Sequence, residues 1–205
     1  MNWFNIEGKY VQYGARLADL MWLNLLTTIC CIPVFTAGAA LTAMHYVLLQ
    51  MVRDQDSRIT SSFFRSFKSN FKQSTIVWLF LLVAGCLLAL DLYWTANPEY
   101  GFTSLLLAGI IIAAVLWVCV IVWIFPLMCH YKNTIKNTVK NTLQLTLLYP
   151  LVFIKMLFFY LVPIILFLFW EQSIIFILLL GFTGPGIACS IQYNKVFLKY
   201  DVPSI

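Results

Sequence analysis

Charged residues are scarce in this sequence of 205 residues. Aspartate, glutamate, lysine and arginine together supply 10%, whereas an average soluble domain has about 25%. Hydrophobic residues reach 62%, and the mean hydropathy is +0.88. A soluble domain of this size could not cover its surface with so few polar groups. The composition therefore indicates an integral membrane protein and excludes a disordered, collagenous or nucleic-acid-binding chain.

Sequence signatures of catalysis and metal binding are also missing. The chain contains no Walker A sequence, no HExxH or GxSxG motif and no catalytic pair of carboxylates, so we expect neither enzymatic activity nor a cofactor. It has no CxxC pair, and we interpret its cysteines as small buried hydrophobic residues. The N-terminus lacks the pattern of a cleaved signal peptide, so we expect it to be retained. The cysteines are Cys30, Cys31, Cys86, Cys119, Cys129 and Cys189.

Apolar segments of membrane-spanning length define the expected fold. A span needs about 20 mainly apolar residues. Four segments meet this length easily, a fifth is long enough, and a sixth is marginal because it carries His45 and Gln50. We therefore predict a single all-α domain over residues 1–205, a polytopic bundle of about six transmembrane helices with the second short or re-entrant. In chain order the segments are 17–35, 37–52, 74–94, 102–129, 143–170 and 173–193.

Basic residues are distributed unevenly between the connections. Five lie in 53–72, three in 130–141 and two in the C-terminal tail, whereas 95–101 and 171–172 contain none. Lysine and arginine near membrane spans remain on the cytoplasmic side. We therefore predict a multi-pass protein of the cell membrane with both termini in the cytoplasm.

Two basic segments are expected to form helices at the cytoplasmic surface. In 53–73, phenylalanines recur on one face and cations on another, the pattern of a helix that lies on lipid or docks to a partner. Segment 130–142 contains a repeated Lys-Asn-Thr unit, which places its lysines along one helical stripe leading into the fifth span. The phenylalanines are Phe63, Phe64, Phe67 and Phe71.

Polar side chains inside apolar segments are candidate functional groups. Asn24, His45 and Lys155 stand out. His45 is either a proton carrier or a hydrogen-bonded packing residue, and Lys155 either extends its amine to the interface or pairs with a carboxylate such as Asp19. The sequence Gly-Pro-Gly at 184–186 interrupts the last span, Pro150 and Pro163 interrupt the fifth, and broken helices line substrate sites in some transporters.

Small residues follow the first proline in the sequence Thr-Ala-Gly-Ala-Ala-Leu-Thr-Ala, residues 36–43. Gly38 with Thr42, and Ala39 with Ala43, recur at a spacing of four, which allows helix backbones to approach closely. This face serves either internal packing or contact with another subunit.

Three stretches together resemble the YesL family of small bacterial membrane proteins. They are 20–43, which contains Asn24 and the sequence CIPVFTAGAALTA; the sequence FFRSFKSNFKQST at 63–75; and the later Lys140 and Asn141. The resemblance implies a protein of unknown function, mainly from Gram-positive bacteria and encoded beside carbohydrate ABC importers. It implies no catalytic or ligand residues.

Two functions follow as expectations. The first is a non-catalytic accessory or assembly subunit of a carbohydrate ABC importer, in contact with the lipid bilayer and the permease subunits, with the small-residue and phenylalanine faces as its interface. The second is a self-sufficient small transporter or channel that uses the broken helices and the intramembrane polar residues.

Overall fold

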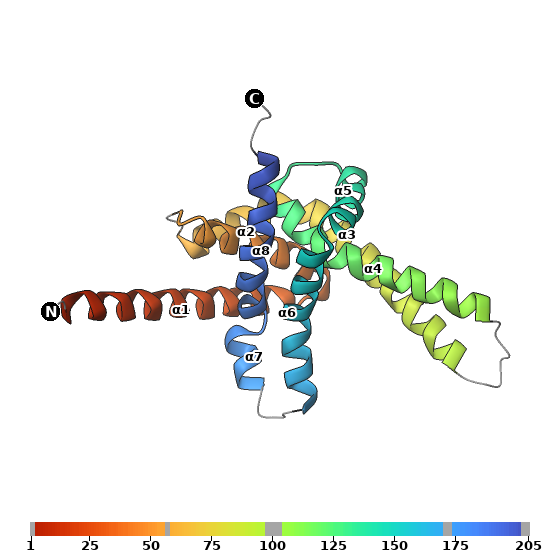
Figure 1. The fold of residues 1–205 in the computed structure, drawn as a ribbon, viewed down its shortest axis with the longest axis horizontal. Helices are drawn as coiled ribbons and strands as arrows, with labels where there is room; N and C mark the ends of the chain where they lie inside the picture. Colours follow the sequence, from red (N-terminus) through yellow and green to blue (C-terminus); the bar gives the residue numbers. More distant parts are fainter. Residues whose placement is uncertain (1–2, 56–57, 97–103, 170–173, 202–205) are drawn as a thin grey trace.

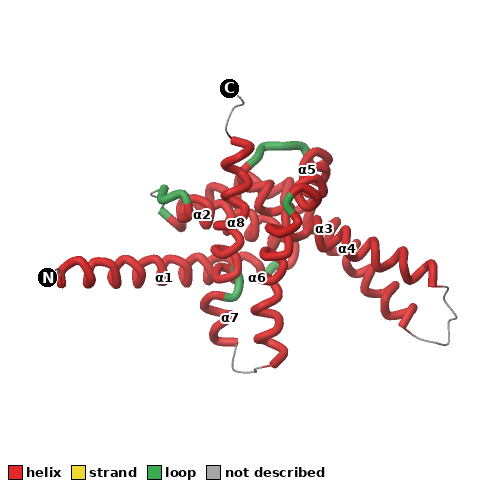
Figure 2. Tube along the Cα trace, in the orientation of Figure 1, coloured by secondary structure: helices red, strands yellow, loops and turns green. Residues whose placement is uncertain are grey.

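All described elements of the structure are helices (Figures 1 and 2). The computed structural model describes residues 3–55, 58–96, 104–169 and 174–201. The prediction of an all-α, polytopic helical protein is confirmed. In chain order the elements are α1 (Trp3–Cys31), the short 3-10 helix η1 (Val34–Thr36), α2 (Ala37–Val52), α3 (Ile59–Ala96), α4 (Ser104–His130), α5 (Ile135–Leu148), α6 (Pro150–Phe169), α7 (Ile174–Leu180) and α8 (Thr183–Asp201).

Five stretches of helix are long and apolar enough to cross a membrane, one fewer than the six expected. Among the described residues, α1 does not qualify. Its apolar run begins after Arg16, includes Asp19 and ends at Cys31, just before Pro33. The expected span 17–35 is therefore cut short. The five stretches are Val34–Val52, Ile59–Thr95, Leu106–His130, Pro150–Phe169 and Phe176–Tyr200.

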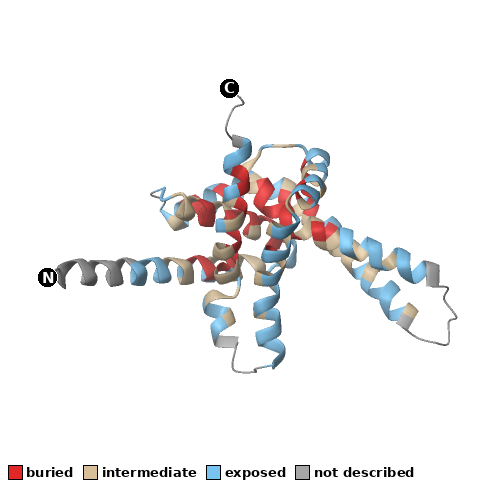
Figure 3. Ribbon diagram, in the orientation of Figure 1, coloured by how far each residue is buried: buried red, intermediate tan, exposed pale blue. Residues whose placement is uncertain are grey.

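The helices radiate from a shared core. In Figure 1, α3 and α4 form one antiparallel hairpin, α6 and α7 form a second pair, and α1 extends away from both. Buried residues concentrate where these elements meet α2 and α8, whereas the outer parts of the hairpins are exposed (Figure 3). The core includes fully buried Trp123, Tyr193 and Phe197. Exposed apolar faces on the hairpins suit contact with lipid.

Helix α3 is longer than the sequence analysis predicts. The amphipathic segment within 53–73 was expected as a separate surface helix before a span at 74–94. Residues 59–73 instead form the first turns of one continuous helix, Ile59–Ala96. The sequence contains no glycine or proline between 59 and 84, so nothing ends the helix at the membrane boundary.

The fifth expected span, 143–170, is divided into two helices at Pro150, as predicted, whereas Pro163 lies within α6 and does not end it. The lysine-rich segment forms α5, which ends at Leu148, and α6 begins at Pro150. Between them Tyr149 has φ −128° and ψ 58°, outside the helical region. Proline disfavours the helical conformation in the residue before it, which explains the break.

The last span is interrupted, as predicted, but three residues earlier. Helix α7 ends at Leu180, and α8 begins at Thr183. Gly184, Pro185 and Gly186 lie in the first turns of α8 rather than in the gap. Proline is tolerated there because the first helical N–H groups have no partner within the helix.

Candidate functional site

Asn24 connects the first helix to the break between α7 and α8. Its Nδ2 donates to the carbonyl oxygens of Leu178 at 2.7 Å and Ile177 at 3.3 Å. Its Oδ1 accepts from the backbone N–H of Phe182 at 2.9 Å and of Thr183 at 3.1 Å. One buried carboxamide therefore caps the C-terminal end of one helix and the N-terminal end of the next.

The surroundings of Asn24 complete this cap. The Thr183 hydroxyl donates to the Leu20 carbonyl oxygen at 3.0 Å, which ties the start of α8 to α1. Both Asn24 and Thr183 are fully buried. Each end of the carboxamide is directed at groups of the complementary kind, so its hydrogen-bonding capacity is used within the chain. The arrangement supports a structural role for Asn24 rather than solute binding.

His45 lies at the centre of a second buried polar cluster, formed by α2, α6 and α8. Its Nε2 is 3.2 Å from the Tyr160 hydroxyl, and its Nδ1 is 3.3 Å from the Tyr193 hydroxyl. The Tyr193 hydroxyl is also 2.6 Å from the Ser190 hydroxyl. His45 is 2% exposed, and none of the hydrogen bonds described for this cluster involves a carboxylate.

The His45 cluster can be satisfied by a neutral ring. A neutral imidazole donates from one nitrogen and accepts at the other, and tyrosine hydroxyls can take either role. The cluster thus joins three helices without a charge. It favours the hydrogen-bonded packing interpretation of His45 over the proton carrier.

Lys155 is separate from both clusters. It lies on an exposed face of α6, close to the start of that helix at Pro150. The ion pair that the structure records within the described ranges joins Arg16 and Asp54, not Lys155 and Asp19. This placement is consistent with a lysine that extends its amine to the interface.

The small-residue face is used inside the chain. Gly38, Ala39, Thr42 and Ala43 are all buried. A Cβ atom on Gly38 would lie 2.5 Å from the Ser74 carbonyl oxygen, so α2 packs directly on the backbone of α3. A partner subunit could reach these residues only if the two helices separated. Their burial favours the internal-packing interpretation of this face over contact with another subunit.

The phenylalanine face is divided between the core and the surface. The rings follow one another along α3, with centroids 6.1 Å apart for Phe63 and Phe67 and 5.5 Å for Phe67 and Phe71. Phe63 is fully buried against α2, whereas Phe64 is 47% and Phe71 36% exposed. Of this face, mainly Phe64 and Phe71 are available to a partner or to lipid.

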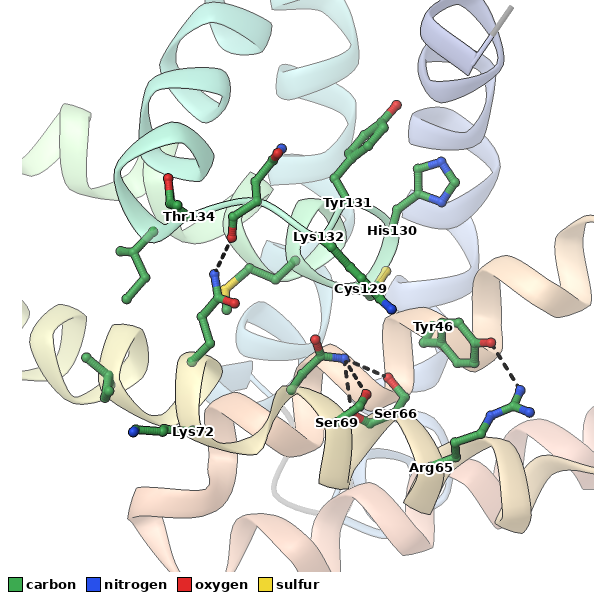
Figure 4. A pocket seen from close by; sticks show the side chains of 16 residues that line it. Tyr46, Arg65, Ser66, Ser69, Lys72, Cys129, His130, Tyr131, Lys132 and Thr134 are labelled. Carbon is green, nitrogen blue, oxygen red and sulfur yellow. Dashed lines mark hydrogen bonds between the residues drawn. The ribbon is translucent and has the colours of Figure 1, made fainter.

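A basic cavity of about 1060 Å³ lies between α2, α3 and the connection from α4 to α5 (Figure 4). Arg65 and Lys72 reach it from α3, and Lys132 reaches it from the connection. None of the described residues that line it is acidic. The sequence predicts that these cations lie on two cytoplasmic surface segments but not that they line one cavity, because spacing within one segment says nothing about contact between segments.

Two hydrogen bonds hold the walls of this cavity. An Arg65 guanidinium N–H donates to the Tyr46 hydroxyl at 3.2 Å, which links α3 to α2. The Gln73 amide donates to the Asn133 carbonyl oxygen at 2.8 Å, which links α3 to the connection after α4. The cavity is therefore bordered by fixed elements.

The described part of the chain contains no cluster of metal ligands and no disulfide. Within it, no three histidine, cysteine, aspartate or glutamate side chains gather in a way that could hold a metal ion. All six cysteines are unpaired. Cys119 and Cys189 are buried as expected, whereas Cys86 is exposed and the other three are partly buried.

The fold and these contacts define a polytopic helical membrane protein in which the buried side chains of Asn24 and His45 are hydrogen-bonded within the chain. Residues 17–92 match the model of a family described as a protein of unknown function, DUF624. The match covers less than half of the chain, from within α1 through most of α3. It includes Asn24, the small-residue face and the phenylalanines. No curated protein and no solved structure matches the chain.

Proposed function

We propose that the protein is a non-catalytic accessory or assembly subunit of a membrane complex, and that its partner is a carbohydrate ABC importer. The observation that carries the proposal is that two polar side chains inside the apolar segments, Asn24 and His45, are hydrogen-bonded within the chain. Asn24 caps a helix break, and His45 is bonded to two tyrosines. A lone transporter needs intramembrane polar groups that can face a solute.

The proposal that the partner is an importer rests on the resemblance to the YesL family. The proposed docking surface rests on the exposure of two phenylalanine side chains on α3. Phe64 and Phe71 lie seven residues apart on α3, which places them on one face of the helix beside cations. Exposed aromatic side chains are frequent anchors in protein interfaces. We propose this face as the contact with a permease subunit.

Copurification tests the accessory role. The full chain, tagged in its own organism and extracted in mild detergent, should recover the permease subunits of a carbohydrate importer. Changing Phe64 and Phe71 together to serine should reduce this recovery about tenfold or more, because interface anchors contribute more than 1 kcal/mol each. Phe158→Ser is the matched control, since Phe158 is 63% exposed on α6, away from this face.

Two outcomes would contradict the accessory role. The first is the absence of importer subunits from the wild-type preparation. The second is sugar uptake by the purified chain alone in liposomes, which would favour the self-sufficient transporter.

The orientation in the membrane is a further prediction, with both termini in the cytoplasm of a multi-pass cell-membrane protein. Both termini share one side only if the number of crossings is even, so we propose that the first of the five stretches, Val34–Val52, is the short or re-entrant one. The basis is the uneven distribution of lysine and arginine between the connections. A reporter that is active only in the cytoplasm should work when fused after Ile205 and fail when inserted in 97–101. The reverse pattern, or equal activity at both positions, would refute this orientation.

A further inference from the structure

The basic cavity is the strongest unassigned site of the molecule. Its cations come from two separate segments, and Figure 4 shows Lys132 extending from the α4–α5 connection toward Tyr46 and Ser66. In the described chain neither Lys72 nor Lys132 pairs with a carboxylate, and no described lining residue is acidic. Like charges around one cavity repel each other unless an anion lies between them.

We propose that this cavity binds the phosphate group of an anionic ligand, with a phospholipid headgroup as its source. Arg65 offers a planar donor fork, and Lys72 and Lys132 offer point charges, a combination that suits phosphate oxygens. The hydroxyl groups of Ser66 and Ser69 line the same wall and supply neutral donors.

The apolar part of the lining favours a lipid over a soluble phosphate. Ile76, Met128 and Ile135 border the cavity beside its polar groups. Ile76 is 49% exposed and is followed along α3 by exposed Leu79 and Phe80, so an apolar surface leads away from the cavity. A headgroup could occupy the basic part while its acyl chains lie along this surface.

The volume agrees with a ligand of this size. About 1060 Å³ is slightly above the usual range of about 300–1,000 Å³ for small-molecule sites and exceeds the space that a single phosphate ion needs. The basic residues also lie on the side that the charge distribution predicts to be cytoplasmic, where the leaflet carries anionic lipids.

The test is a lipid titration of the purified full chain, followed by native mass spectrometry. Phosphatidylglycerol should bind and phosphatidylcholine should bind much more weakly. Lys72→Gln with Lys132→Gln should weaken phosphatidylglycerol binding by about tenfold or more, because each cation near an anionic headgroup contributes about fivefold. Lys68→Gln with Lys136→Gln is the matched control, since these lysines lie in the same segments but do not line the cavity.

A second titration uses glycerol phosphate to separate the two sources of phosphate. One outcome is that glycerol phosphate binds, that phosphatidylglycerol does not, and that the Lys72 and Lys132 changes abolish the binding of glycerol phosphate. In that case the cavity is a phosphate site for a soluble ligand. Equal losses in the cavity pair and the control pair would overturn the proposal, because they would indicate general surface charge. Absence of binding by both phosphate compounds would overturn it as well.

Discussion

Replacing Asn24 with leucine is expected to lower the melting temperature of the detergent-solubilised protein by about 10 °C. The change leaves two carbonyl groups and two N–H groups at the break between α7 and α8 without their side-chain partner. An unsatisfied buried polar group costs about 1–3 kcal/mol, and polar contacts between membrane helices measure about 0.6 kcal/mol on average. A total of about 3 kcal/mol is therefore reasonable, and each kcal/mol shifts the melting temperature by about 2–4 °C at this chain length.

A matched pair of variants separates the effect of losing the Asn24 cap from the effect of replacing any asparagine with leucine. Asn137 lies exposed on α5, so Asn137→Leu makes the same chemical change without breaking a described contact. Thr183→Val provides an intermediate step, because it removes the hydroxyl that donates to Leu20 and, at 3.4 Å, to Asn24 Oδ1, but leaves the other hydrogen bonds of Asn24 in place. The expected order of stability is wild type and Asn137→Leu first, then Thr183→Val, then Asn24→Leu. Equal melting temperatures for the two leucine variants would show that the cap is unimportant.

The sequence was sufficient to predict those helices that follow directly from a long apolar segment. Residues 102–129 form an uninterrupted apolar run, and α4 covers Ser104–His130 as expected. The sequence was less informative about a boundary where the helix simply continues because no residue terminates it. Helix α3 continues through 59–73 into the membrane-spanning part because no residue stops it, although the change from polar to apolar character suggested two elements.

The sequence identified Asn24 as an important polar residue but did not predict its hydrogen-bond partners. An asparagine within an apolar run is costly, and this identified Asn24 as important. Its partners lie more than 150 positions away in the chain, and no periodicity within a segment connects them. The same limit applies to the basic cavity, where Arg65 and Lys132 meet only because α3 packs beside the end of α4.

Replacing Gly38 with alanine is expected to destabilise the protein by about 2–4 kcal/mol. The added Cβ atom would lie 2.5 Å from both the Ser74 carbonyl oxygen and the Cβ atom of Trp78. Neither is the flexible end of a side chain, so α2 and α3 must move apart. Their separation would strain the 3.0 Å hydrogen bond between Thr42 and Ser74 as well. Overpacking of a close contact costs about 1–3 kcal/mol and sometimes more.

Gly109→Ala gives the opposite expectation for the same chemical change. Gly109 is exposed within α4, and nothing lies within 4 Å of its added Cβ atom. Alanine favours a helix over glycine by up to about 1 kcal/mol, so this variant should melt at the wild-type temperature or a few degrees above it. Thermal unfolding in one detergent compares the two directly. If the melting temperatures of Gly38→Ala and Gly109→Ala agree, α2 and α3 do not pack backbone to backbone, and the small-residue face becomes available to a partner subunit after all.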